Sequence, residues 1–194
     1  MRELVYYVSV TIDGFIAGPD DEVDFYPRSE EYTEWMTSEY GDALPAHVRQ
    51  SFGIDDVPNT KFDTIVMGRR TYDPALAIDI TSPYAHLRQY IFSRELSQPS
   101  YPDVQIVDDD PIDLVRKLKA EDGPLDIYLA GGGRLAGQLV PEIDRMVVKR
   151  YPIVAGDGLR AFDTWFQPAR FDLTEEKQFP GGNAVSFYVR AADD

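Results

Sequence analysis

Hydrophobic residues recur along the chain in short runs, and several of these runs alternate with polar residues as β-strands do. The first run, 4–12 (LVYYVSVTI), places Ser9 and Thr11 between valine and isoleucine residues, which is a strand pattern. Comparable runs follow at intervals to the end of the chain. We predict strands over 4–12, 63–67, 88–92, 104–107, 125–130, 145–151, 171–179 and 184–190.

Between several of these runs lie segments with helical spacing. One opens with Pro111 and repeats Ile112, Val115 and Leu118 at the spacing of one helix face, and proline is favoured in the first turn of a helix. Another begins at Ser29, a residue type that caps helices. We predict helices over 29–40, 111–121 and 133–140, and an irregular or weakly helical stretch over 41–60.

The order of these elements predicts an α/β fold. Strands that alternate with helices form a central, mostly parallel sheet with helices on both faces. The last two strands have no helix between them, so the sheet should end in an antiparallel hairpin, and Gly181-Gly182 suits its turn. Because no internal repeat or linker interrupts the pattern, we expect residues 1–194 to form a single domain.

Composition places the chain among ordinary globular proteins. It has 194 residues, of which 43% are hydrophobic, and this is enough for a buried core. It has no cysteine, which excludes disulfides and thiolate metal sites and fits a reducing compartment. The first apolar run is too short and too polar for a signal peptide or a membrane span. We therefore expect a cytoplasmic protein with no membrane partner.

The net charge of -15 argues against a nucleic-acid partner, because phosphates would be repelled over most of the surface. Motifs of metalloproteases, serine hydrolases and P-loop proteins are absent. His47 and His86 lie far apart along the chain, and the acidic run 108–110 precedes a proline as a helix cap does. We predict no metal site.

Cations and glycines follow three of the predicted strands, where open α/β sheets bind ligands. Arginine side chains, hydroxyls and backbone N–H groups at helix starts are what a phosphate requires. Taken singly, an arginine pair also suits a solvated helix start, and three glycines suit a tight turn. Together they indicate a phosphorylated ligand. The segments are Gly68-Arg69-Arg70-Thr71, Ser93-Arg94 and Gly131-Gly132-Gly133-Arg134.

An ordinary Rossmann dehydrogenase is an alternative reading of the glycines. Gly131, Gly133 and Ala136 match G-x-G-x-x-A, but this match comes late in the chain. The acidic ribose ligand expected about 20 residues on is also missing, since Arg150 stands nearest that spacing. We rank this alternative last.

Five motifs carry a more specific resemblance. They are VTIDGFIAGPD, TIVMGRRTYDP, YIFSR, IYLAGGGRLAGQLV and YPIVAGDGLRAF. In this order, over residues 4–162, the chain resembles the dihydrofolate reductase superfamily, and within it the branch of the reductase domain of the riboflavin-pathway deaminase–reductase. The resemblance implies a three-layer dihydrofolate-reductase-like fold and NADPH as the cofactor.

The resemblance also implies roles for individual residues. Ala17, Gly18 and Asp20 would belong to the loop that closes over the nicotinamide, and Val8 and Ser9 would line the substrate pocket. The phosphates and the rest of the cofactor would be held by Gly68, Arg69, Arg70, Thr71, Ser93, Arg94, Gly131, Gly132, Gly133, Arg134 and Leu135.

The chain departs from the family pattern at the proton donor. Dihydrofolate reductases carry a carboxylate on the first helix, but residues 19–60 do not align with that segment. Glu31 lies one helical turn before Trp35 and is our first candidate, with Glu30 and Asp24 as alternatives. Glu30 and Glu31 also have a purely structural explanation, because the helix dipole favours acidic residues in the first turn of a helix. Phe25, Tyr26 and Trp35 could flank a flat heterocycle.

We therefore expect an NADPH-dependent reductase that transfers hydride to a C=N or C=O group of a heterocyclic or ribosyl-linked substrate. The riboflavin precursor, a ribosylaminopyrimidine phosphate, is the first substrate to consider, and dihydrofolate is the second. A protein that binds NADP(H) but has lost catalysis is the rival. We also expect a homodimer, because the apolar C-terminal hairpin would otherwise leave an exposed sheet edge.

Overall fold

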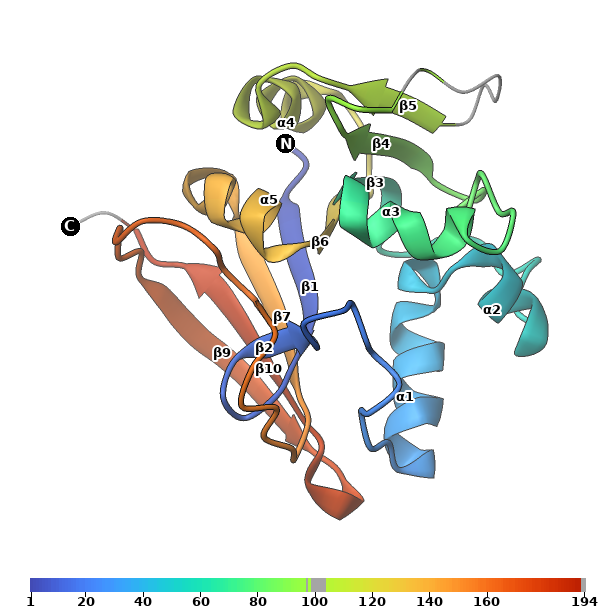
Figure 1. Cartoon of the computed structure of the whole chain (residues 1–194), viewed down its shortest axis with the longest axis vertical. Coiled ribbons are helices and arrows are strands. Elements are labelled where there is room, and N and C mark those ends of the chain that lie inside the picture. The colour runs from blue at the N-terminus through green and yellow to red at the C-terminus, as the bar shows by residue number, and fades with distance from the viewer. Residues whose placement is uncertain (97, 99–103, 193–194) are drawn as a thin grey trace.

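The computed structural model describes residues 1–96, 98 and 104–192. Its centre is an eight-stranded sheet in the order β5-β4-β3-β6-β1-β7-β10-β9 (Figure 1). In the sheet as described, β10 runs antiparallel to β7 and β9, and the other pairings are parallel. The strands are β1 (Leu4–Val10), β3 (Phe62–Gly68), β4 (Arg88–Phe92), β5 (Val104–Val107), β6 (Asp126–Gly131), β7 (Arg145–Arg150), β9 (Phe171–Gln178) and β10 (Ala184–Arg190).

The predicted α/β fold with an antiparallel C-terminal hairpin is confirmed. The inner strands are apolar along most of their length because both of their faces are covered, as parallel sheets require. In β1 this covering buries every residue except Ser9. The hairpin of β9 and β10 turns at Gly181 and Gly182, which both have positive φ, the backbone region that glycine adopts without strain.

Helices cover both faces of the sheet (Figure 1). Val5 and Tyr7 of β1 pack on the face that holds α1, whereas Leu4 and Tyr6 pack on the opposite face with α4 and α5, since successive strand residues point to opposite sides. The helices are α1 (Glu30–Tyr40), α2 (Ala46–Ser51), α3 (Arg69–Leu76), α4 (Pro111–Ala120) and α5 (Gly133–Gln138). In the part of the chain that the structure describes, no helix is long and apolar enough to cross a membrane.

The predicted helix caps are confirmed. Ser29 accepts a hydrogen bond from the backbone N–H of Tyr32 at the start of α1. Asp110 accepts one from Ile112 at the start of α4, at 2.8 Å. Each side chain satisfies a first-turn N–H group that has no partner within its own helix. The acidic run 108–110 therefore ends as the expected helix cap.

Four elements differ from the sequence prediction. The first strand ends at Val10 rather than at residue 12, because Gly14 has a φ of 87° and the chain reverses there. After this turn, β2 (Phe15–Ala17) pairs with β8 (Leu159–Arg160) in a separate antiparallel sheet. Helix α3 contains Pro74, a residue that disfavours helix interiors, and its pattern predicted only a helix start.

Candidate functional site: an arginine-lined cleft at the carboxyl end of the sheet

A cleft of about 890 Å³ lies at the carboxyl ends of β3, β4, β5 and β6. Four of the segments that line it follow predicted strands, including the three expected to bind a phosphate, and a fifth segment, 158–160, includes β8. Its charged side chains are five arginines and five carboxylates. They are Arg69, Arg70, Arg94, Arg134, Arg160, Asp73, Glu95, Asp108, Asp109 and Asp163.

The arginine pair at the start of α3 is held by nearby acids. Arg69 is bonded to Asp73, one turn along the helix, and lies 3.8 Å from a carboxylate oxygen of Glu95. Arg70 donates to Asp21 at 2.9 Å. These pairs are solvent-accessible, so each contributes little to stability. Arg69 is therefore positioned inside the cleft, whereas Arg70 connects the cleft to the loop around residue 21.

Arg94 differs from both. In the part of the chain that the structure describes, it makes neither a hydrogen bond nor an ion pair, and its side chain is exposed. Ser93, beside it, accepts hydrogen bonds from the backbone N–H groups of Glu95 and Leu96 at 3.2 and 3.0 Å. The serine hydroxyl thus shapes the turn that presents Arg94 to the cleft.

The three glycines at the end of β6, from Gly131 to Gly133, are glycine for different structural reasons. Gly131 has a φ of 109°, in the region that favours glycine. At Gly133 an added Cβ would overlap the carbonyl oxygen of Arg160, so packing demands glycine there. At Gly132 an added Cβ would lie 3.8 Å from the Thr71 hydroxyl and 4.0 Å from Ile16, which are ordinary contacts. The described residues around Gly132 therefore leave room for a Cβ, which would take up space in the cleft.

The loop over residues 153–160 is attached to the turn after β1. Asp13 accepts hydrogen bonds from the Thr11 hydroxyl at 2.6 Å and from the N–H groups of Ala155 and Gly156 at 3.1 and 2.7 Å. The hydrogen bond from Thr11, followed by the two amides, lowers the pKa of Asp13 to about 2. Gly158 then passes so close to the carbonyl of Ala17 that a Cβ would overlap it.

The loop residues predicted to close over the nicotinamide lie near this junction. Ala17 and Gly18 are buried, whereas Asp20 is exposed and its N–H bonds to Glu22 at 2.9 Å. Thr71, from the first turn of α3, faces the glycine turn across from Gly132. The structure therefore brings together the predicted cofactor residues from β3, β4 and β6.

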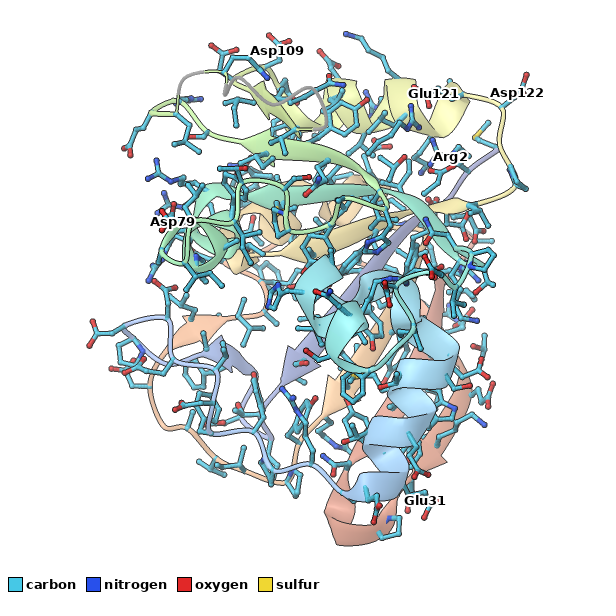
Figure 2. All side chains as sticks on the ribbon, turned by 90° about the vertical axis from the view of Figure 1, so that its right-hand side faces the viewer. Arg2, Glu31, Asp79, Asp109, Glu121 and Asp122 are labelled. Atoms are coloured by element: carbon cyan, nitrogen blue, oxygen red, sulfur yellow. The ribbon has the colours of Figure 1, made fainter. Side chains whose placement is uncertain are left out.

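The structure does not bring the predicted proton donors to this cleft. The buried face of α1 consists of Tyr32, Met36 and Tyr40, spaced by one turn each. Glu30 and Glu31 fall outside this face and are exposed, where the helix dipole favours them. Figure 2 shows Glu31 at the opposite end of the molecule from Asp109, which lines the cleft. Asp24 is exposed as well.

The residues predicted to bind the substrate do not form one site either. Val8 packs on the α5 face, so of the β1 pair only Ser9 faces α1. Trp35 packs against the C-terminal hairpin, with its ring 5.4 Å from that of Phe179. Phe25 rests on Tyr26, with ring centroids 4.6 Å apart. Trp35 and Phe25 thus take part in the core of the α1 face.

Sequence reasoning missed a group of buried polar side chains on that face. Tyr26 donates to the carbonyls of Ser9 and Phe15 at 3.4 and 3.2 Å, and the hydroxyls of Tyr32 and Tyr151 are hydrogen-bonded at 2.8 Å. Lys149 lies on the same face as Tyr151, two residues along the chain. The available signal was the strand period itself, which places residues 147, 149 and 151 on one side.

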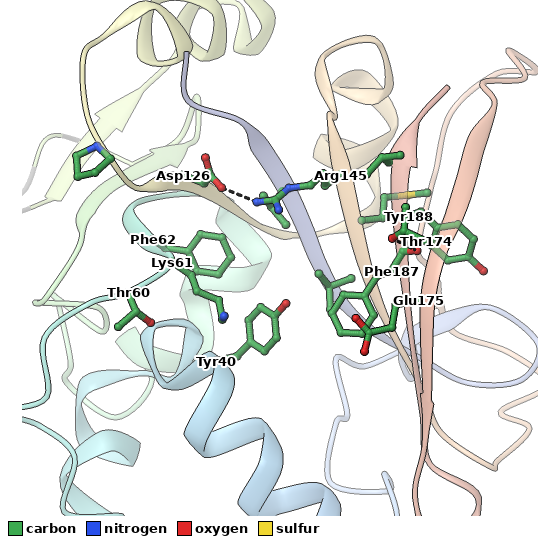
Figure 3. Close-up of a pocket in the computed structure, with 15 residues that line it drawn as sticks. Tyr40, Thr60, Lys61, Phe62, Asp126, Arg145, Thr174, Glu175, Phe187 and Tyr188 are labelled. Carbon is green, nitrogen blue, oxygen red and sulfur yellow. Dashed lines mark hydrogen bonds and ion pairs between the residues drawn. The ribbon is translucent and has the colours of Figure 1, made fainter. Parts of the chain in front are cut away.

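A second cavity of about 380 Å³ lies near the amino ends of β1, β6 and β7 (Figure 3). Its cations are paired with nearby carboxylates: Arg145 bonds to Asp126, which also lines the cavity, at 2.5 Å, and Lys61 lies 3.5 Å from Glu39. This end of a parallel sheet is also the one that α/β proteins do not use for ligands. We interpret it as a structural cavity.

This architecture, a mostly parallel sheet with helices on both faces, a closing antiparallel hairpin and a cleft at the carboxyl ends, is that of the dihydrofolate reductase superfamily. Within that class the chain belongs to the RibD C-terminal domain family, which matches residues 2–185.

The relatives agree with this assignment. The chain is 30% identical to the uncharacterized protein YwjB of Bacillus subtilis, over 98% of this chain and 99% of YwjB, and 24% identical to YyaP of the same organism, over 93% and 91%. A protein of Shewanella sp. PV-4 named for riboflavin biosynthesis superposes with a TM-score of 0.74, 21% identity and coverage of 98% and 100%.

A bifunctional enzyme of Thermotoga maritima also shares the fold. This diaminohydroxyphosphoribosylaminopyrimidine deaminase/5-amino-6-(5-phosphoribosylamino)uracil reductase superposes with a TM-score of 0.62 and 14% identity, and the match covers 98% of this chain but 57% of the enzyme. At such identities the solved structures establish the fold alone.

Proposed function

We propose that the protein is an NADPH-dependent reductase that transfers hydride to a C=N or C=O group of a small heterocyclic or ribosyl-linked substrate. The observation that carries this proposal is the combination of Arg94 and Gly132 in one cleft. Arg94 is an arginine without an acid partner in the described residues. Gly132 is a glycine at which an added Cβ would meet only ordinary contacts among the described residues.

The cleft residues fit the cofactor. Arg94 and Arg69 would hold the 2′-phosphate, because guanidinium groups bind phosphate in a forked, charge-assisted geometry. Thr71 would contact the pyrophosphate, and Gly132 would let the pyrophosphate approach the backbone closely. Bound NADPH supplies the hydride, and the protein's contribution is to orient the acceptor and exclude water.

The family indicates which acceptors to test first. A pyrimidine such as 5-amino-6-(5-phosphoribosylamino)uracil comes first, since the Thermotoga maritima enzyme that shares the fold is named for its reduction. Dihydrofolate comes second, because it is the substrate of the dihydrofolate reductases that the chain resembles. The test is loss of NADPH absorbance with each acceptor, run beside a binding titration of NADPH alone.

The two readouts separate the possible outcomes. Oxidation of NADPH with one acceptor supports the proposal. Binding of NADPH without oxidation by any acceptor in the panel, which should extend to other cyclic imines and ketones, would instead support a binding protein without catalysis. Absence of binding would refute the cofactor assignment. Arg116→Ala is the matched control for cleft arginines, since Arg116 is an exposed arginine on α4 paired with Glu142.

We also propose a homodimer formed through the C-terminal hairpin. Strand β9 is at the edge of the sheet, and its residues from Asp172 to Gln178 are exposed, including Leu173 at 55%. Unpaired edge strands invite pairing with another chain. Light scattering at micromolar concentration should give the mass of a dimer, and a mass of 22.0 kDa would refute the proposal.

A further inference from the structure

Lys149 is a buried lysine near the carboxyl end of β7. It lies opposite Ser9 of β1 and Val185 of β10 in the sheet register, and 8% of its surface is exposed. Its neighbours on the same side of the strand are Val147 and Tyr151, which both belong to the core under α1. The ammonium group therefore lies between the sheet and the segments that cover this face.

No acid neutralises this ammonium group. In the described part of the chain, Lys149 makes neither an ion pair nor a hydrogen bond, and its one polar contact is the ring of Tyr7, 3.6 Å from Nζ to the centroid. In contrast, Lys61, Lys119 and Lys177 each lie within 4.0 Å of a carboxylate. Burial of an unpaired charge is costly, so the fold alone gives no reason to keep a lysine here.

The face of the sheet that holds Lys149 is rich in tyrosine rings and hydroxyls. The hydroxyls of Tyr32 and Tyr151 bond to each other, and that of Tyr26 donates to backbone carbonyls. Burial raises the pKa of Tyr26 and of Tyr32 well above the ordinary value, so these tyrosines stay neutral. The buried hydroxyl of Tyr7 has no hydrogen-bond partner among the described residues. The cluster thus offers a cation and an unused hydroxyl to an incoming polar group.

This cluster is connected to the cleft through β2. The Tyr26 hydroxyl joins the carbonyls of Ser9 and Phe15. Ile16, the next residue, lies 4.0 Å from where a Cβ on Gly132 would be. This series of contacts joins Ser9, and Lys149 beside it in the sheet, to the glycine turn of the cleft.

We propose that Lys149 is a catalytic residue of the substrate site, where its ammonium group contacts the acceptor ring. This inference rests on the proposed reductase function. As hydride from the bound NADPH forms the new C–H bond, the C=N or C=O π electrons move to nitrogen or oxygen. Lys149 gives that atom a proton, and the neutral amine regains one from water. The products are NADP⁺ and the reduced ring.

The ionisation of Lys149 suits this role. Burial, and to a smaller extent the charge of Arg28, lowers the pKa of Lys149 to about 7. A proton donor works best when its pKa is near the working pH. In the described part of the chain, the charged and titratable groups that contact or act on the Lys149 ammonium are Arg28 and Tyr7, and neither is a carboxylate that would restore an ordinary lysine pKa.

The first test needs no substrate. The chain has five lysines, so carbon-13 labelled lysine gives few NMR signals to follow during a pH titration. One signal should titrate near pH 7, far below the ordinary lysine value of about 10.4, and it should be missing in Lys149→Met. If all lysine signals in the wild-type protein titrate near the ordinary value, the proposal is wrong, whatever the variant does.

The second test uses orotate, a pyrimidine that carries a carboxylate, against uracil, which is neutral. Calorimetry with the wild-type protein, with and without NADP⁺, should show that orotate binds about tenfold more tightly than uracil at a pH near 6. A difference of this size is the contribution of one hydrogen bond to a charged group. The preference should fade as the pH rises through 7. Lys149→Met should abolish it.

Lys61→Met is the matched control. Lys61 also lies over a tyrosine ring, that of Tyr40 at 5.0 Å, but it is paired with Glu39. This variant should keep the preference for orotate. A preference that persists in Lys149→Met, or that the wild-type protein lacks, would overturn the role of Lys149. Failure of NADPH to bind in a separate titration would instead refute the reductase function. The orotate titration would still show whether Lys149 binds an anionic ring.

Discussion

The two ends of the sheet carry the same kinds of charged residue in opposite arrangements. At the amino end, Arg2 is 2% exposed and donates to the Leu125 carbonyl, to Thr64 and to Glu121. At the carboxyl end, Arg134 is 85% exposed and lies 4.0 Å from its nearest carboxylate, while Arg94 has no acid partner in the described chain. A closed network stabilises a fold, whereas an open one is available to a ligand.

The strongest test of this contrast is Arg2→Ala. The change removes the buried guanidinium that donates to the Leu125 carbonyl and to Thr64, and each hydrogen bond made by a charged group is worth about 1.5–3 kcal/mol. Urea unfolding should show this loss of stability. NADPH affinity, measured under conditions where the variant is folded, should be unchanged. A stability loss below about 1 kcal/mol would mean that the amino-end network is not structural.

Gly132 and Gly133 are adjacent, and they separate a residue that serves the ligand from one that serves the fold. Gly132→Val should weaken NADPH binding by about 100-fold or more, roughly 2.7 kcal/mol, because its side chain takes up space in the cleft. Its stability should change by less than about 1 kcal/mol. Gly133→Val should instead destabilise the fold, since it would overlap the Arg160 carbonyl. Normal NADPH binding by folded Gly132→Val would show that the glycine serves only the turn.

Arg94→Ala should act on the ligand alone. Loss of a charge-assisted hydrogen bond to the 2′-phosphate costs about 1.5–3 kcal/mol, so NADPH affinity should fall by about 10- to 100-fold. NADH affinity and the urea midpoint should stay at wild-type values. Arg116→Ala should change neither affinity. Fluorescence titration with both cofactors measures these affinities, and urea unfolding measures the midpoint. An equal loss of affinity for NADPH and NADH would remove Arg94 from the 2′-phosphate site.

The smallest effect concerns the loop over residues 153–160. Asp13 has a lowered pKa of about 2, against 3.8 for an unperturbed group, so its contribution is present above pH 3.8 and is lost as the pH falls toward 2. Asp13→Asn should speed hydrogen exchange at the amides of Ala155 and Gly156 above this range. Unchanged exchange at both amides would show that Asp13 does not hold the loop.

Much of the fold could be predicted from the sequence because the strand runs are long and flanked by clear breaks. The runs at 88–92, 104–107 and 184–190 coincide with strands of the structure. The elements that were missed are short or irregular. Strand β2 has three residues and β8 has two, and both depend on a pairing between distant segments that local patterns do not reveal.

The site residues also divide into those that the sequence could predict and those that it could not. The cofactor residues follow strand ends, and parallel strands bring such ends to one edge, so their grouping in the cleft could be predicted. The face of α1 could not, because the packing of Tyr32 on Tyr151 and Phe179 decides which side is buried. That packing turns Glu31 to solvent. Lys149 was missed because a lysine near the end of a strand ordinarily faces solvent.

The central claim is that Arg94, together with Arg69, binds the 2′-phosphate of NADPH in the carboxyl-end cleft. The most direct measurement is a pair of fluorescence titrations of the wild-type protein, one with NADPH and one with NADH, in the same buffer. Our account predicts that NADPH binds at least about tenfold more tightly, the effect of one charge-assisted hydrogen bond or more. Equal affinities for the two cofactors would contradict it.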